Sequence, residues 1–255
     1  MIEKPDSPLV ARLHPSPNIE PRNRGLTPNI LLLHYTGLAS VEKALEILSR
    51  PDCKVSCHYV IDEDGTIIQM VAESERAWHA GLSFWAGESD INSASIGIEI
   101  QNPGHQLGYR DFPEKQMRAV TELSRDIVAR HGMRAERVLA HSDVAPARKI
   151  DPGEKFDWPG LARSGIGHWV APAPITADDA GLDIGSEGAG VERARMLLAR
   201  YGYGLESEGA LDESMKPVVR AFQLHFRPAR TDGCLDRSTV DTLERLVAAL
   251  TATVA

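Results

Sequence analysis

The chain has 255 residues, enough for one domain of ordinary size and a second, smaller one. Hydrophobic residues make up 42% of it and charged residues 25%, a composition typical of a folded globular protein. The formal net charge of -8 argues against a protein built to bind nucleic acid, and no apolar run approaches the ~20 residues of a membrane-spanning helix.

The N-terminal segment and the cysteines bear on the cellular compartment. Residues 1–11 contain acids and prolines where an export signal would have an apolar core. Cys53, Cys57 and Cys234 form an odd, sparse set, which fits reduced thiols better than a disulfide framework. A metal site built from Cys53, Cys57 and His58 is an alternative, but no second Cys/His pair at finger-like spacing follows it. We therefore expect a cytoplasmic protein, or a periplasmic one if an export signal is missing from this sequence.

The first elements are expected within residues 1–51. Residues 1–27 are rich in proline and asparagine, and we expect an extended arm. The apolar run over residues 29–33 predicts a buried strand that ends at His34. Residues 41–50 have the apolar spacing of a helix, which Pro51 ends.

The next part of the chain alternates between strands and helices. An amphipathic helix is expected over residues 113–131, with a proline near its start and Gly132 at its C-cap side. Strands are expected near residues 58–62, 66–71, 94–101 and 138–140. This order predicts an α/β (α+β) fold, with a mixed central β-sheet flanked by helices.

The composition changes in residues 169–183, which are rich in proline and alanine. This composition predicts a linker with few contacts. Three amphipathic segments follow, at about residues 190–200, 212–226 and 236–249, and predict a small three-helix bundle. The expected organisation is therefore an arm, a main domain, a linker and a helical domain, over residues 1–27, 28–168, 169–183 and 184–255.

A loop late in the main domain carries the residues with the clearest chemistry. His141 and Asp151 stand ten positions apart, and Pro146 and Pro152 argue against a regular helix between them. Imidazole and carboxylate groups are ligands of a metal such as zinc. His34, at the tip of a buried strand, is the best candidate for a third ligand.

Three ligands with one open position are the catalytic arrangement of zinc, which makes a bound water nucleophilic near neutral pH. Glu99 is the candidate base, because strand alternation would place its carboxylate among apolar neighbours. Lys149 is the candidate cation for a developing oxyanion. Each residue also has a structural interpretation: His34 as a core histidine, Asp151 as a turn residue and Lys149 as a solvated charge.

The joint pattern resembles a known family, the zinc-dependent N-acetylmuramoyl-L-alanine amidases of the AmpD-like branch, relatives of peptidoglycan-recognition proteins. The resemblance spans roughly residues 27–165. Five motifs carry it in order: His34-Tyr-Thr, His58-Tyr-Val-Ile-Asp, Arg76-Ala-Trp-His-Ala-Gly, Ser95-Ile-Gly-Ile-Glu and His141-Ser-Asp-Val-Ala-Pro-Ala-Arg-Lys-Ile-Asp-Pro-Gly.

The resemblance implies roles for individual residues. His34, His141 and Asp151 fall on the ligands of one zinc ion per chain, Glu99 on the catalytic acid and Lys149 on the stabiliser of the transition state. It also implies a mixed sheet flanked by helices, with the zinc in a groove.

Four further polar residues are candidates for substrate binding. Trp78 and His79 are expected to line the groove, with packing as the alternative. Asn102 and His105 follow the strand of Glu99 and are candidates for the groove rim.

The C-terminal part resembles the small three-helix peptidoglycan-binding domains, through Val219-Arg-Ala-Phe-Gln and Asp232-Gly233 above all. The alternative is a bundle that serves only as a spacer.

Together these resemblances imply hydrolysis of the amide between the lactyl group of N-acetylmuramic acid and L-alanine, in peptidoglycan or muropeptides. The alternatives are a peptidoglycan-recognition protein that does not cut and a zinc peptidase acting on another amide. The missing export signal favours soluble anhydro-muropeptides as the substrate, whereas a wall-binding bundle favours the polymer.

Overall fold

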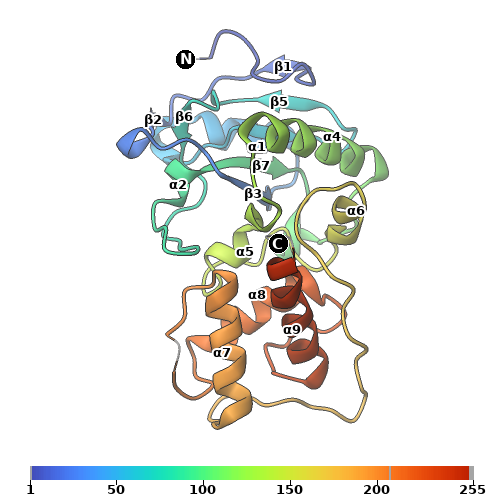
Figure 1. The fold of residues 1–255 in the computed structure, drawn as a ribbon. Coiled ribbons are helices and arrows are strands. Elements are labelled where there is room, and N and C mark those ends of the chain that lie inside the picture. Colours follow the sequence, from blue (N-terminus) through green and yellow to red (C-terminus); the bar gives the residue numbers. More distant parts are fainter. Residues whose placement is uncertain (1, 207, 253–255) are drawn as a thin grey trace.

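A six-stranded mixed sheet forms the centre of the N-terminal domain (Figure 1). Its strand order is β1-β5-β4-β7-β3-β8. The computed structural model describes residues 2–206 and 208–252. Strands β4, β7, β3 and β8 are parallel, whereas β5 runs antiparallel to β4 and parallel to β1. The strands are β1 (Arg12–Leu13), β2 (Ile19–Pro21), β3 (Ile30–Tyr35), β4 (Tyr59–Ile61), β5 (Ile67–Gln69), β6 (Glu75–Ala77), β7 (Ser95–Ile100) and β8 (Val138–Ala140).

Helices flank this sheet and follow it, as the expected α/β fold class requires. In the N-terminal domain they are α1 (Val41–Ser49), α2 (Ile91–Ala94), α3 (Gly104–Leu107), α4 (Glu114–His131), α5 (His141–Val144) and α6 (Trp158–Arg163). Short 3-10 turns occupy Asn23–Gly25, Pro51–Cys53 and Ala135–Arg137. The bundle consists of α7 (Ala189–Tyr201), α8 (Met215–Phe226) and α9 (Arg237–Ala252).

Strand alternation decides which side chains reach the site. On β3, Leu31 and Leu33 belong to the hydrophobic cluster that contains the apolar face of α4. Successive strand residues point to opposite faces of a sheet, so His34 lies on the face away from α4. On β7 the isoleucines 96, 98 and 100 share the α4 cluster, which leaves Glu99 on the same face as His34. Both faces of these strands are covered, as the continuous apolar run predicts.

The N-terminal arm is extended, as expected, but it is also part of the fold. Strand β1 pairs with β5 at the edge of the main sheet, and β2 forms a separate antiparallel pair with β6. The Arg22 guanidinium donates hydrogen bonds to the backbone carbonyls of Ser93, at 2.7 Å, and Ser95, at 3.0 Å. The arm therefore covers an open sheet edge and holds the start of β7 in place.

The helical bundle shares a hydrophobic core with the N-terminal domain, which differs from the expected joint with few contacts. One cluster combines Ile30, Leu32 and Trp85 with the buried residues of α7, α8 and α9. The segment after α6 is also attached, because Ala173 N–H donates to Thr242 Oγ1 and Ser238 Oγ–H donates to the Ala173 carbonyl. Figure 1 shows α5 at the junction, between the sheet above and the bundle below.

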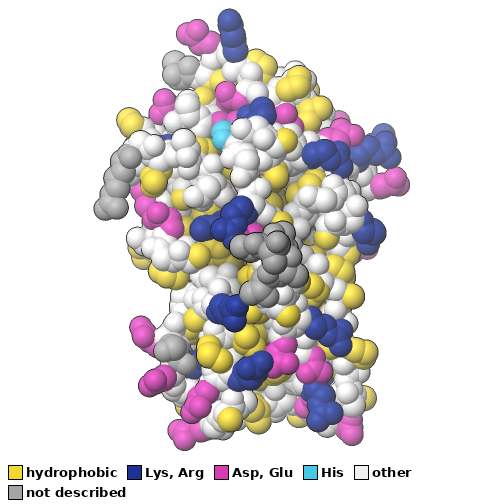
Figure 2. Space-filling model, in the orientation of Figure 1, with side chains coloured by type: hydrophobic (Ala, Val, Ile, Leu, Met, Phe, Trp, Pro, Cys, Tyr) yellow, Lys and Arg dark blue, Asp and Glu magenta, His cyan; other side chains and the backbone are white. Residues whose placement is uncertain are grey.

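Charged side chains of both signs are interspersed over the two domains on the face shown in Figure 2. None of the helices in the described part of the chain combines the length and the apolar character needed to cross a membrane.

Candidate metal centre and active site

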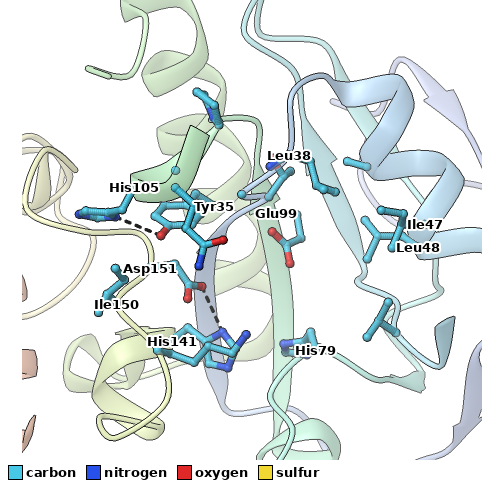
Figure 3. A pocket seen from close by; sticks show the side chains of 18 of the residues that line it. Tyr35, Leu38, Ile47, Leu48, His79, Glu99, His105, His141, Ile150 and Asp151 are labelled. Carbon is cyan, nitrogen blue, oxygen red and sulfur yellow. Dashed lines mark hydrogen bonds and ion pairs between the residues drawn. The ribbon is translucent and has the colours of Figure 1, made fainter. Parts of the chain in front are cut away.

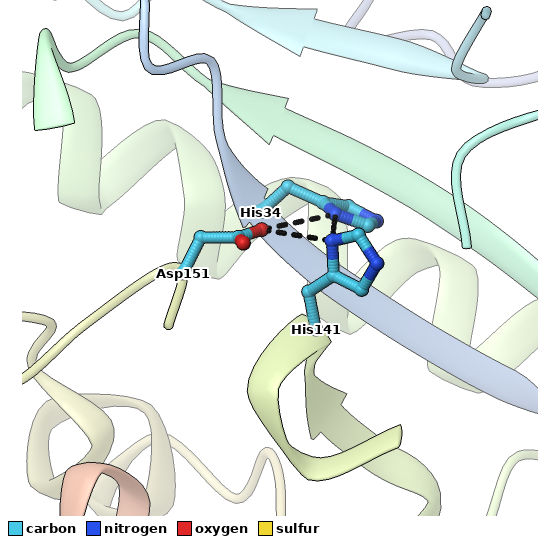
Figure 4. A group of neighbouring side chains, drawn as sticks. All are labelled: His34, His141 and Asp151. Atoms are coloured by element: carbon cyan, nitrogen blue, oxygen red, sulfur yellow. Dashed lines mark hydrogen bonds and ion pairs between the residues drawn. The ribbon is translucent and has the colours of Figure 1, made fainter. Parts of the chain in front are cut away.

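Three side chains from separate parts of the chain meet at the end of β3. His34 lies near the end of that strand, His141 is the first residue of α5, and Asp151 lies in the loop that follows. All three are buried, with at most 6% of each residue exposed. The structure thus brings together the three ligands expected from the sequence (Figure 4).

The ligand atoms face one another at short distances. His34 Nδ1 lies 2.9 Å from His141 Nδ1 and 3.2 Å from Asp151 Oδ2, and His141 Nδ1 lies 3.1 Å from Asp151 Oδ2. A tetrahedral zinc ion with bonds of ~2.0–2.1 Å would separate its ligand atoms by roughly 3.3 Å. The three atoms are therefore close to the spacing that such an ion requires.

The other nitrogen of each histidine has a partner that leaves Nδ1 free for a metal. His141 Nε2 donates to the Ala80 carbonyl at 3.2 Å. His34 Nε2 contacts His79 Nδ1 at 3.0 Å, and His79 Nε2 contacts Ser95 Oγ at 3.3 Å. Ser95 donates its own proton to the Ile91 carbonyl, at 2.6 Å, so it accepts from His79. The chain of donors assigns the protons to Nε2 of His79 and Nε2 of His34.

The ionisation states agree with this assignment. Burial, together with the electrostatic effect of the nearby His141 ring, lowers the pKa of His34 to about 4, so His34 is neutral at pH 7. Although burial alone would raise it, the neighbouring histidines hold the pKa of Asp151 well below its usual range. Metal ligands must be neutral imidazoles and ionised carboxylates. Two free lone pairs and a carboxylate oxygen within 3.2 Å of one another fit a bound cation.

Glu99 lies beside this group on β7. It pairs in register with His34 across the parallel strands. It also lines a cavity whose wall includes His141 and Asp151. Its Oε2 is shielded from solvent and has no hydrogen-bond partner. Burial and the charge of Asp151 raise the pKa of Glu99 well above its usual value, while the Lys149 cation opposes that rise. A carboxyl group in this setting holds a proton more readily than a solvated one, which suits a general acid–base role.

The cavity next to the metal group has a volume of about 460 Å³ (Figure 3). One wall comes from α1 and its neighbours, through Leu38, Ile47 and Leu48, and the opposite wall from the loop that carries Lys149 and Asp151. In Figure 3 the Glu99 carboxylate points into the space between these walls. The cavity therefore has the Glu99 carboxyl, the Lys149 side chain and two members of the candidate metal group, His141 and Asp151, on its wall.

The four residues expected to bind substrate have different surroundings. Trp78, His79 and His105 line the cavity. His79 also contacts His34, at 3.0 Å between His79 Nδ1 and His34 Nε2, a role that the sequence analysis does not predict. Asn102 is only 1% exposed and is not among the cavity-lining residues; its amide donates to the Arg110 carbonyl and accepts from Gly104 N–H. Its side chain holds the turn before α3.

The alternative metal set around Cys57 does not come together. Cys57 is buried, and its thiol contacts the Tyr59 carbonyl at 3.2 Å. His58 Nδ1 accepts from Gly97 N–H at 2.9 Å, and His58 Nε2 contacts the Glu75 carbonyl at 3.1 Å. Both ring nitrogens are thus engaged in holding the sheet.

Two further residues at the cavity were not singled out from the sequence. Tyr35 lines it and its hydroxyl lies 3.1 Å from His105 Nδ1. Arg148 lines it and donates to the carbonyls of Ala80 and Leu82. Tyr35 follows His34 in the sequence and Arg148 precedes Lys149. This adjacency is the one sequence feature that could have indicated that they lie at the site.

Comparison with known proteins agrees with this geometry. Residues 24–154 match the N-acetylmuramoyl-L-alanine amidase family, and residues 187–243 match a peptidoglycan binding domain family. The N-acetylmuramoyl-L-alanine amidase AmiD of Escherichia coli K12 is 37% identical over 232 residues, which cover 86% of this chain and 82% of AmiD. The chain belongs to the N-acetylmuramoyl-L-alanine amidase family. It is an amidase of the carbon–nitrogen hydrolase type, as its motifs predict.

Other members of the amidase family show how far the similarity extends. The 1,6-anhydro-N-acetylmuramyl-L-alanine amidase AmpD of E. coli K12 is 34% identical over 165 residues, which cover 58% of this amidase and 88% of AmpD. The structure of E. coli AmiD with anhydro-N-acetylmuramic acid-L-Ala-D-γ-Glu-L-Lys superposes with a TM-score of 0.74, 33% identity, and coverage of 90% of this chain and 92% of AmiD. AmpDh3 of Pseudomonas aeruginosa, in complex with anhydromuramic pentapeptide, gives a TM-score of 0.72 at 30% identity, with coverage of 91% and 95%. The amidase therefore shares both of its domains with AmiD and AmpDh3.

Proposed function

We propose that this amidase holds one zinc ion per chain on His34, His141 and Asp151, and uses it to cleave the amide between the lactyl group of N-acetylmuramic acid and L-alanine in soluble anhydro-muropeptides. The convergence of three ligand atoms within 3.2 Å at the wall of a cavity that also holds Glu99 carries the proposal. The muropeptides bound to AmiD and AmpDh3 support the substrate class.

A bound zinc ion would polarise the scissile carbonyl and lower the pKa of a water molecule. Glu99 takes the proton of the attacking water and returns it to the leaving amine of L-alanine, since its residue lines the cavity and its Oε2 has no other hydrogen-bond partner. Lys149 lines the same cavity and provides positive charge for the oxyanion that develops at the carbonyl. His79 keeps the His34 ring in its orientation.

Digestion of a purified anhydro-muropeptide tests the proposed reaction. We expect two products by mass spectrometry: a sugar with a free lactyl carboxylate and a peptide that begins with L-alanine. Cuts inside the peptide would support a zinc peptidase, and the absence of any product at full zinc content would support a recognition protein that does not cut.

The helical bundle is proposed to bind glycan. The match of residues 187–243 to a peptidoglycan binding domain family supports this role. Pull-down of the full chain with insoluble peptidoglycan, compared with a chain in which exposed bundle residues are changed, tests it.

The cytoplasmic location remains a prediction, with the periplasm as its alternative. All three cysteines are free in the structure, which is compatible with a reducing compartment. Fractionation of cells that express the native gene decides between the two compartments.

A further inference from the structure

Asp143 links the helical bundle to the metal centre. It lies two residues after His141 and is only 1% exposed. Its carboxylate accepts hydrogen bonds from Ala140 N–H at 2.8 Å, Tyr203 Oη–H at 2.6 Å and His225 Nδ1–H at 2.7 Å. A buried carboxylate depends on such partners, because an unpaired one would be strongly destabilising. Two of the three donors belong to the bundle.

The position of Asp143 affects both metal ligands that come from this part of the chain. Its hydrogen bond from Ala140 N–H caps the N-terminus of α5, a single helical turn that begins with His141. In the same turn, Ser142 N–H donates to the backbone carbonyl of Asp151 at 3.1 Å. A shift of α5 would therefore move His141 and Asp151 together.

The two bundle donors are themselves held firmly against the N-terminal domain. The Tyr203 ring meets the Trp85 ring edge-on, with centroids 4.9 Å apart. The His225 ring stacks between Trp158, at 3.6 Å, and Phe226, at 3.8 Å. All of these side chains are buried, so the donors have fixed positions from which to orient Asp143.

We propose that Tyr203 and His225 are positioning residues of the amidase, which act through Asp143 to hold the α5 turn and its metal ligands in place. The proposal rests on the proposed function, since it takes His141 and Asp151 as zinc ligands. It gives the bundle a role in the chemistry of the neighbouring domain, in addition to any binding of glycan.

Replacement of a single hydroxyl tests the proposal in the full chain. Tyr203→Phe removes one donor to Asp143, and Tyr201→Phe is its matched control. Tyr201 is buried in the same interface, but its hydroxyl lies 3.0 Å from His168 Nδ1 and does not bond to Asp143. Zinc affinity is measured by competition with a chelator, and kcat and KM with a soluble anhydro-muropeptide.

We expect Tyr203→Phe to weaken zinc binding ~3- to 10-fold, less than the 10- to 100-fold typical of direct partners of a ligand, because it acts one layer further out. At saturating zinc we expect a lower kcat with little change in KM. Tyr201→Phe should bind zinc within about twofold of the parent.

A second pair of variants tests the other donor. His225→Asn keeps an N–H group near the position of Nδ1, whereas His225→Gln places its amide further from the backbone. Both lose the stacked ring, so loss of packing alone predicts equal effects. We expect the asparagine variant to retain more zinc affinity and more turnover than the glutamine variant.

The proposal is overturned if folded Tyr203→Phe binds zinc as tightly as the parent, or if Tyr201→Phe loses as much affinity. Equal behaviour of the two His225 variants would also overturn it for that residue. Failure of the proposed function has a different signature: the parent chain would bind no zinc, or His141→Ala would bind it as tightly as the parent.

Discussion

His34 and Glu99 are direct partners across the parallel strands β3 and β7, and both side chains lie on the sheet face away from α4. The proposed metal ligand and the proposed general base are thus placed side by side by strand register. A slip of one residue would turn Glu99 to the opposite face, where the α4 cluster lies. The rigid centre of the sheet therefore sets the distance between the two groups.

Glu99→Gln is expected to keep its zinc and lose most of its turnover. The amide has nearly the shape of the carboxyl but cannot accept the proton of a water molecule. General acid–base groups contribute on the order of 10²–10⁴-fold, and we expect a fall in kcat in that range. Zinc content by atomic absorption must be equal in the two proteins; a rate within a few-fold of the parent would move the base to another residue.

Asp151→Ala is expected to lose most of its zinc, because only two protein ligands remain. Asp111→Ala is the control, since that carboxylate is 90% exposed and is not part of the metal group. Metal analysis after dialysis compares the two variants with the parent. Full occupancy in Asp151→Ala would remove Asp151 from the ligand set.

The sequence predicted the ligand group because its members lie in short, specific motifs, and because a polar residue at the end of an apolar strand is conspicuous. It did not predict the contact of His79 with His34, since 45 residues separate them and either side chain could have faced a groove. The structure shows that Gly97 leaves room for the His79 ring, because a Cβ at this position would lie 2.5 Å from it.

The shared interface of the two domains could not be predicted from the sequence either. The proline-rich composition of residues 169–183 predicts a linker with few contacts, yet Asp143 and His225, 82 residues apart, form a buried pair across the junction. Local composition describes how a segment behaves alone, whereas this contact depends on the placement of α8 against α5.

His79→Ala is expected to weaken zinc binding 10- to 100-fold, as is typical when the partner of a ligating histidine is removed. The His34 ring would lose the acceptor that fixes its Nε2 proton. His79→Asn should restore part of the affinity, because its side-chain oxygen can accept from His34. Chelator competition measures all three proteins, and unchanged affinity in the alanine variant would contradict this role.

Glu73 is expected to make stability depend on acid pH. Burial would raise its pKa, but hydrogen bonds from Arg130, His131 and Tyr59 outweigh that effect and lower the pKa of Glu73 from 4.5 to about 2. A carboxyl whose pKa is lower in the folded state stabilises the fold at pH values above its pKa in the unfolded chain. This contribution, about 3 kcal/mol, is lost as the pH falls from 4.5 toward 2.

Denaturant unfolding at pH 5 and pH 3 checks this expectation with Glu73→Gln beside the parent. Both proteins are measured without zinc, so that metal release does not contribute. The parent should lose more stability between the two pH values than the variant does. Equal losses would show that other groups account for the acid sensitivity.

Removal of the bundle, by ending the chain after His168, is expected to destabilise the remaining domain. It would expose Trp85, now 1% exposed, at a cost of about 2–3 kcal/mol, and would take two hydrogen bonds from Asp143, at about 1 kcal/mol each. Since 1 kcal/mol corresponds to roughly 2–4 °C in a domain of this size, the melting temperature should fall by about 10 °C or more.

The matched control keeps the bundle and lengthens the connection, by insertion of a Gly/Ser segment after the exposed Ile175. If the bundle supports the metal centre through its contacts, the inserted chain should melt and bind zinc like the parent, while the shortened chain should bind zinc more weakly and cleave soluble muropeptides more slowly. Soluble substrate is required, because tethering to the wall would change the effective concentration of a polymeric one. A shortened chain that matches the parent in melting temperature, zinc affinity and soluble turnover would show that the two domains are independent in solution, whatever they share at their interface.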